Sequence, residues 1–274
     1  MSRSWIEFVQ SQLLPWTPAP LASIRPGVEC RVLSSDEENG ACSLLVRYPP
    51  GWRSPGGALV AGEELFVVEG ALTIAERRYS DYSFAHFPAG FVTGEWTSEA
   101  GAIVLQFFSA LPRLLPGVPP YDERKLVTHL DALAVPYTGN FHPQFPPGAG
   151  RKILYQDPDT LDTTWLLGTM PLRWAERAEV HPTVEEMYLL AGEVHGNRGV
   201  MRPGAYFWRP GSLPHGPYGT QTGNLYLFRT QGGGLSTQYV DPDRPFQWWP
   251  PYDAILPPEL AAYAGEVSSS AHRW

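Results

Sequence analysis

The chain has 274 residues, which is enough for two compact domains of roughly 100 to 150 residues that each bury a core. Its 28 acidic and 20 basic residues give a net charge of -8, and no lysine or arginine cluster stands out, which argues against a nucleic-acid partner. No stretch approaches about 18 consecutive apolar residues and no charged-then-apolar segment opens the chain, so we expect neither a membrane span nor secretion. We expect Cys30 and Cys42 to be reduced packing residues and the protein to be cytoplasmic.

Short helices are predicted at the two ends of the chain. Near the N-terminus, Ser4 would cap a helix with Glu7 at its third position, and Phe8 and Leu13 would lie on its apolar face. Near the C-terminus, residues 258–263 form a second helical pattern, which follows a Pro- and Trp-rich tail. Elsewhere, 29 prolines and 27 glycines divide the chain into segments too short for long helices.

The segments between these ends have the length and pattern of β-strands. Residues 65–68, 103–107 and 225–228 are apolar runs bounded by glycine. Residues 82–86 and 206–208 alternate between aromatic and other side chains before a proline, which is typical of a strand with one buried face. The sequence therefore predicts an all-β protein.

The chain contains an internal repeat with an offset of 122 residues. This offset superposes the following residues of the first half on those of the second without a gap: Leu44, Trp52, Glu63, Gly70, Pro88 and Gly94 on Leu166, Trp174, Glu185, Gly192, Pro210 and Gly216. A repeat of this length is a tandem pair of domains, not a solenoid array.

The two copies differ at the positions that carry chemistry. The second copy has Glu179, His181 and His215 where the first copy has glycine, leucine and threonine at positions 57, 59 and 93. We therefore expect function to reside in the second half.

The polar residues of the second copy predict a metal site. Glu179 and His181 are separated by one residue, so on a strand they point to the same side, roughly 6.6 Å apart along the chain. Glu185 has the same parity, and His215 follows a proline-rich turn. Two imidazoles and one or two carboxylates suit one divalent transition metal such as Zn, Mn, Fe or Ni. Glu186, which has the opposite parity, is expected on a solvent-exposed face.

These residues resemble the first sequence motif of the cupin superfamily. Glu179-x-His181 is followed after three residues by Glu185 and after six more by Gly192, in place of the superfamily's His-x-His, Glu and glycine. The resemblance implies that Glu179, His181 and Glu185 contribute to a metal site inside a barrel.

The second cupin motif is also similar. Gly204 is followed after five residues by Pro210, and His215 comes five positions later, so His215 would be a further metal ligand. The residues around both motifs resemble those of ChrR-like cupins and their two-cupin relatives. This resemblance implies two tandem antiparallel β-barrels of the jelly-roll type. We expect residues 1–118 to form a degenerate, metal-free barrel and residues 119–274 a metal-binding barrel with a C-terminal tail.

The sequence departs from the cupin pattern in ways that affect the site. The first histidine of the superfamily is Glu179, the opening glycine is Arg173, and a later glycine is Ser212, which excludes a three-histidine centre. Glu179 is either a ligand or an unbound general base beside the metal. Glu185 is either a ligand or a structural hydrogen-bond acceptor, because its counterpart Glu63 survives in the copy without histidines.

Three classes of function remain open. The first is a metal-dependent enzyme that acts on a small polar molecule by Lewis-acid and general-base chemistry, as a hydrolase, isomerase or lyase, with Glu179 as the catalytic residue. The second is a dioxygenase-type oxidoreductase with non-haem iron, since two histidines and one carboxylate also form that ligand set. The third is a non-catalytic metal or metabolite sensor that resembles ChrR-like regulators. An enzyme is favoured, with no cofactor other than the metal and a homodimer as the default assembly.

Overall fold

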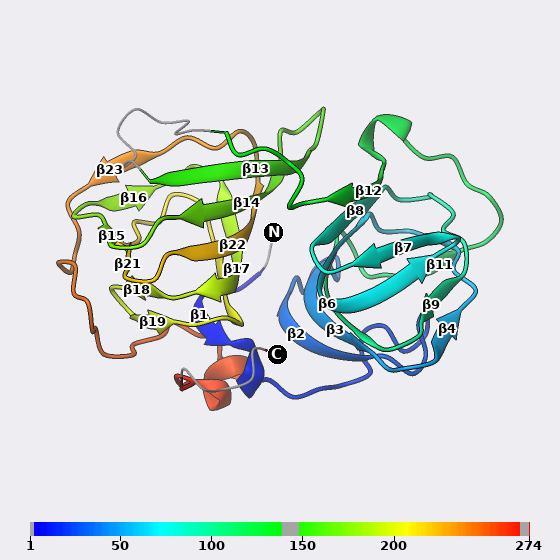
Figure 1. Cartoon of the computed structure of the whole chain (residues 1–274), viewed down its shortest axis with the longest axis horizontal. Helices are drawn as coiled ribbons and strands as arrows, with labels where there is room; N and C mark the ends of the chain where they lie inside the picture. Colours follow the sequence, from blue (N-terminus) through cyan, green and yellow to red (C-terminus); the bar gives the residue numbers. More distant parts are fainter. Residues whose placement is uncertain (1–2, 139–147, 269–273) are drawn as a thin grey trace. The chain divides into compact units, whose positions relative to one another are not determined.

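The computed structural model describes residues 3–138, 148–268 and 274, and it divides the chain into two compact β units (Figure 1). One unit contains Leu14–Ala134, and the other contains Ser4–Leu13 together with Val135–Trp274. The division therefore differs from the predicted boundary after residue 118. The N-terminal segment belongs to the second unit because β1 (Ile6–Gln10) pairs with β20 (Ala205–Arg209). Residues beyond 118 remain in the first unit because β12 (Val127–Asp131) pairs with β8 (Ser83–Phe87).

The first unit is built around a sheet with the strand order β12-β8-β6-β10-β3-β2. Its further strands are β2 (Glu29–Ser35), β3 (Cys42–Tyr48), β4 (Trp52–Ser54), β5 (Ala58–Leu59), β6 (Glu63–Ile74), β7 (Arg77–Ser80), β9 (Trp96–Ser98), β10 (Ala102–Phe108) and β11 (Leu114–Leu115), and it has one short helical turn, η2 (Glu123–Lys125). The apolar side chains of β3, β6 and β10 fill the interior, and the two cysteines are buried among them.

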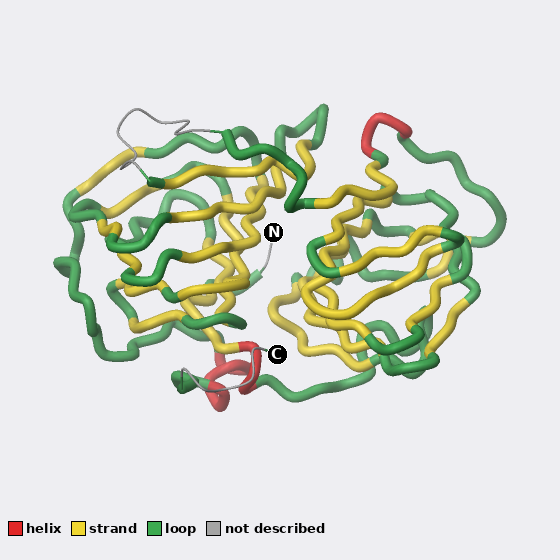
Figure 2. The backbone as a smooth tube through the Cα atoms, viewed as in Figure 1, coloured by secondary structure: helices red, strands yellow, loops and turns green. Residues whose placement is uncertain are grey.

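The second unit has a sheet with the order β1-β20-β17-β22-β14-β13, which faces a smaller sheet, β15-β21-β18-β19. Its further strands are β13 (Ala149–Gln156), β14 (Thr163–Thr169), β15 (Arg173–Trp174), β16 (Ala178–Val180), β17 (Val184–Gly192), β18 (Val194–Gly196), β19 (Gly199–Met201), β21 (Gly219–Thr220), β22 (Asn224–Gln231) and β23 (Gln238–Val240). Its helical turns are η1 (Ser11–Leu13) and η3 (Pro258–Tyr263). Every strand pairing in the described parts of the two units is antiparallel, so the predicted all-β fold with two antiparallel barrels is confirmed (Figure 2).

Alternation along β17 separates the interior of the second barrel from its outer face. Met187 and Leu189 pack in the apolar core, and Glu185 shares their parity, so its carboxylate lies at one end of that core. The expected exposure of Glu186 is wrong, because this side chain is only 2% exposed. It accepts hydrogen bonds from Tyr206 and Arg229, which compensate its burial.

The predicted N-terminal helix is wrong for most of its length. Residues 6–10 form β1, and only Ser11–Leu13 make a helical turn, whereas the predicted C-terminal turn is present at Pro258–Tyr263. A short capping pattern gains little free energy in isolation, while all five residues of β1 are buried in the second unit. A register shift between Ile6 and Val9 interrupts the alternation of this strand.

None of the helices that the structure describes is long and apolar enough to cross a lipid bilayer.

Candidate metal centre

The backbone brings Glu179 and His215 together directly. The amide of Glu179 donates to the carbonyl of His215 over 2.9 Å, and the amide of His215 donates to the carbonyl of Glu179 over 3.0 Å. Directly opposed residues of an antiparallel pair present their side chains on the same face. Ser212 stands in the intervening turn at φ +67°, a conformation that favours glycine, which is the residue of the cupin pattern at this position.

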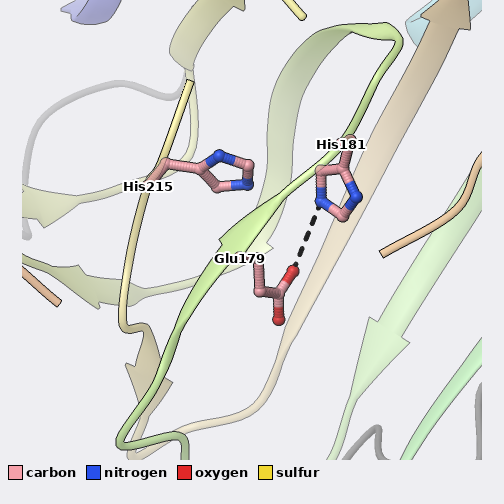
Figure 3. Close-up of side chains that lie close together, drawn as sticks. All are labelled: Glu179, His181 and His215. Atoms are coloured by element: carbon pink, nitrogen blue, oxygen red, sulfur yellow. Dashed lines mark ion pairs between the residues drawn. The ribbon is translucent and has the colours of Figure 1, made fainter. Parts of the chain in front are cut away.

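Three predicted site residues form a cluster whose possible ligand atoms lie close together. One ligand atom from each of Glu179, His181 and His215 lies within 4.8 Å of the others, and Figure 3 shows the three side chains turned toward a common point. Nε2 of His181 lies 3.5 Å from Oε2 of Glu179. Both imidazoles are buried, whereas the Glu179 side chain is 19% exposed. The structure therefore brings these three predicted residues together.

Hydrogen bonds orient both imidazole rings. Nδ1 of His181 lies 3.0 Å from the carbonyl oxygen of Ser236, and Nδ1 of His215 lies 2.9 Å from that of Leu213. A carbonyl oxygen can only accept, so each Nδ1 carries a proton and each Nε2 is left facing the centre of the cluster. Such a contact at the outer nitrogen is what fixes a histidine in the tautomer that a metal requires.

Glu185 joins the cluster from β17. Its Oε1 lies 3.3 Å from Nε2 of His181, and its Oε2 lies 3.2 Å from Nε2 of His215. Burial raises the pKa of Glu185, but His181, His215 and Arg209 outweigh this effect and hold the pKa well below its usual range. Burial likewise lowers the pKa of His181, while the carboxylates of Glu185 and Glu179 raise it, and the net direction is upward. The carboxylate of Glu185 is therefore ionised and touches both imidazoles.

An ion-pair network behind Glu185 was not predicted. Arg209 is the cross-strand neighbour of Glu185, and its Nη1 donates to Oε2 of that residue over 2.8 Å. The same guanidinium donates through Nε and Nη2 to the two oxygens of Glu7, over 2.7 and 2.5 Å. Tyr218 completes the network by accepting from Nη2 and donating to Glu7. Glu7 was placed on a helix by sequence, and no local signal connects it with a strand about two hundred residues away.

The cluster opens into a cavity of about 100 Å³ in the interior of the second barrel. Most of its lining is apolar and comes from both sheets, namely Trp165, Leu167, Met187, Val194, Met201, Phe207, Tyr226 and Phe228, with Leu235 from the segment after β22. Two guanidinium groups, those of Arg173 and Arg209, also line it. The cavity therefore combines an apolar lining with a few polar and charged groups, as ligand sites generally do.

The first barrel has the same backbone arrangement without the ligands. Gly57 and Thr93 exchange the pair of backbone hydrogen bonds that Glu179 and His215 exchange in the second barrel. Glu63, the counterpart of Glu185, accepts two hydrogen bonds of 2.7 Å from Arg25, whose guanidinium lies 4.0 Å above the ring of Trp96. The cavity at this place has a volume of only about 20 Å³. A guanidinium therefore neutralises the retained carboxylate here.

Comparisons with known proteins agree with this architecture. A family model for the ChrR cupin-like domain matches residues 7–111, which lie mainly in the barrel that lacks the histidines. The predicted resemblance to ChrR-like cupins is therefore confirmed, although the motifs that suggested it come from the other barrel. No curated protein matches the chain at a significant level of sequence similarity.

Solved structures share the fold across most of the chain. A protein of Nostoc punctiforme, provisionally assigned as a dioxygenase, superposes with a TM-score of 0.80 at 20% identity and covers 88% of this chain and 92% of its own. Oxalate decarboxylase of Bacillus subtilis superposes with a TM-score of 0.59 at 13% identity, and the match covers 85% of this chain and 79% of the decarboxylase chain. A protein of Pseudomonas aeruginosa, provisionally described as glyoxylate-induced, superposes with a TM-score of 0.61 at 15% identity. The match covers 90% of this chain and 94% of the Pseudomonas chain. Both units therefore have the cupin fold of these structures, and residues 7–111 match the ChrR cupin-like family model.

Proposed function

We propose that the second barrel binds one divalent transition metal and that the protein is a metal-dependent enzyme. His181 and His215 would supply their Nε2 atoms and Glu185 a carboxylate ligand, while Glu179 would be either a fourth ligand or the general base beside the metal. The observation that carries this proposal is the pair of Nδ1-to-carbonyl hydrogen bonds, which turn both Nε2 atoms toward the carboxylates.

The charges around the site also support a cation. Arg209 donates one hydrogen bond to Glu185 and two to Glu7, so its single positive charge is shared between two carboxylates, and Glu179 and Glu185 also face the two imidazoles. Buried carboxylates are costly unless a cation pairs with them. A divalent ion would provide that charge and leave both imidazoles neutral, as ligation requires.

The proposed chemistry assigns the proton to Glu179. A divalent ion held by these residues would supply a Lewis acid that polarises a substrate oxygen. Glu179 is the most exposed of the four side chains and lines the cavity, so its carboxylate can accept a proton from a substrate and return it. Hydrolase, isomerase and lyase reactions all use this combination of polarisation and proton transfer.

The first barrel is proposed to be metal-free. Gly57, Leu59 and Thr93 offer no ligand atoms equivalent to those of the second barrel, and Arg25 already pairs with Glu63. A cation entering this place would have to displace a buried guanidinium. One metal ion per chain is therefore expected.

A dioxygenase-type reaction is the second candidate function. The Nostoc protein provisionally assigned as a dioxygenase superposes over most of both chains, and two histidines with one carboxylate form the ligand set of non-haem iron oxygenases. This candidate requires iron at the site and consumption of dioxygen. The first candidate requires neither.

Metal analysis of the purified protein tests the proposal. Elemental analysis after aerobic and anaerobic purification should find about one equivalent of a divalent transition metal per chain, and oxygen uptake with added iron separates the two candidates. His181→Ala and His215→Ala should lose the metal, whereas His129→Ala, which changes a half-buried histidine of the first barrel, should retain it. Full metal content in both site variants would refute the proposed centre.

A further inference from the structure

A second cationic side chain, besides that of Arg209, lines the metal cavity. Arg173 in β15 lines the same cavity as Glu179, His181 and His215. Its chain neighbours Leu172 and Trp174 are 73% and 51% exposed, whereas Arg173 itself is half-buried. The alternation of this short segment therefore turns the guanidinium inward while its apolar neighbours remain at the surface.

The internal repeat shows that this arginine is particular to the second barrel. The offset of 122 residues places Arg173 on Gly51, and glycine is also the residue of the cupin pattern at this position. The neighbouring positions, Trp52 and Trp174, are identical in the two copies. The barrel that has the candidate metal site is therefore also the one that carries a cation at this point of the fold.

The surroundings of Arg173 favour binding of an anion. Burial lowers the pKa of Arg173, while Tyr226, Glu179 and Tyr239 act in the opposite direction. The guanidinium remains charged at neutral pH, since arginine does not deprotonate in proteins. A guanidinium that has lost part of its hydration forms strong, two-point hydrogen bonds with a carboxylate.

The balance of charge in and beside the cavity points to a ligand with a single negative charge. Three carboxylates and two guanidinium groups are buried or half-buried there: Glu7, Glu179 and Glu185, and Arg173 and Arg209. These groups together carry one negative charge. The proposed divalent ion would reverse this to one positive charge, which a monoanion would neutralise.

The remaining lining suggests what the anion carries. Trp165, Leu167, Met187, Phe207 and Phe228 present aromatic and aliphatic surface to the cavity. Apolar surface of this kind binds an alkyl or aryl group by excluding water.

We propose that the ligand of the second barrel is a small organic acid with an alkyl or aryl body, and that Arg173 binds its carboxylate. The apolar body lies against the interior aromatic side chains, and a second polar group faces Glu179 and the two histidines. The charge argument and the position of the reacting group rest on the proposed metal function. Recognition of the carboxylate by Arg173 rests on the position of Arg173 in the cavity lining, and it does not require the metal.

A matched series of ligands tests this assignment on the full-length, metal-loaded protein. Titration calorimetry would compare acetate, butyrate, phenylacetate and 3-phenylpropionate with the corresponding neutral amides. At least one of the longer acids should bind about tenfold or more tightly than its amide and than acetate, because the amide lacks the charge and acetate lacks the apolar body. Acids that bind no more tightly than their amides throughout the series would overturn the proposal.

Variants of Arg173 connect the preference to this residue. Arg173→Gln should abolish the acid-over-amide preference, whereas Arg173→Lys should keep part of it, because the charge remains and the two-point geometry is lost. Arg53→Gln, which removes the same charge from a side chain of the first barrel that is 74% exposed, is the matched control and should keep the full preference. An unchanged preference in Arg173→Gln would contradict the assignment.

The same titrations on chelator-treated protein separate this proposal from the metal function. Chelator-treated protein that takes up no divalent transition metal again but shows an Arg173-dependent preference for acids would support the carboxylate site and refute the metal centre. A protein that retains one metal but shows no such preference would refute the carboxylate site alone.

Discussion

Glu7 and Arg209 form a two-point ion pair although 202 positions separate them in the chain. Both side chains are buried, and burial raises the pKa of Glu7, but Arg209, His215 and Trp5 together lower it further, so the carboxylate is ionised. Arg209 also donates to Glu185. The N-terminal strand therefore contributes directly to the electrostatics of the candidate metal centre in the second barrel.

Loss of Glu7 should destabilise the second barrel. Glu7→Ala leaves the buried Arg209 with one carboxylate partner in place of two, and breaking a buried ion pair typically costs about 3–5 kcal/mol. Urea unfolding should show a lower midpoint for Glu7→Ala, whereas Glu37→Ala, at an exposed position of the first barrel, should match the unchanged protein. Equal midpoints for the two variants would show that the pair adds nothing to stability.

The two carboxylates nearest the imidazoles should respond differently to substitution. Glu185→Gln should weaken metal binding about tenfold to a hundredfold, because it removes charge from a group that touches both histidines. Glu179→Gln separates its two roles: loss of metal makes Glu179 a ligand, and retained metal with lost turnover makes it the proton-transfer residue. Glu176→Gln, at an exposed position nearby, is the control, since the buried Glu186 would introduce a structural defect. Metal affinity from competition with a chelator dye is the measurement.

Metal affinity should fall as the pH is lowered, beginning above the usual histidine range. In the metal-free protein Glu185 and Glu179 raise the pKa of His181 against the effect of burial, so this imidazole keeps its second proton to a higher pH than usual. The metal must displace that proton, and the competition strengthens as the pH falls. Calorimetry in buffers of different ionisation enthalpy should detect proton release near neutral pH. Binding without proton release would contradict this account.

The first barrel should hold no metal even when the metal is in excess. Arg25 occupies Glu63, and the cavity there is about a fifth as large as that of the second barrel, 20 against 100 Å³. Elemental analysis after incubation with excess metal and removal of the unbound ions should give one equivalent per chain. Arg25→Met should lower the stability of the first barrel by about 3–5 kcal/mol, because it leaves a buried carboxylate without its cation. Two equivalents of tightly bound metal in the unchanged protein would refute the prediction.

The sequence by itself determined the features that depend on spacing along the chain. The offset of 122 residues predicted that Glu179 and His215 correspond to Gly57 and Thr93, and both pairs form the same backbone bridge. Strand parity placed Glu179 and His181 on one face, and glycine and proline divided the chain into short strands. These features could be predicted because a strand repeats every two residues whatever lies beside it.

Only the tertiary structure decided which distant groups meet. A capping pattern at Ser4 predicted a helix, but pairing with β20 makes residues 6–10 a strand and brings Glu7 to Arg209. Parity predicted exposure of Glu186, yet both faces of β17 are buried. The carbonyl groups that orient the two imidazoles come from Ser236 and Leu213, which no motif identifies. Burial and ionisation depend on contacts between segments far apart in the chain, and local periodicity carries no information about those contacts.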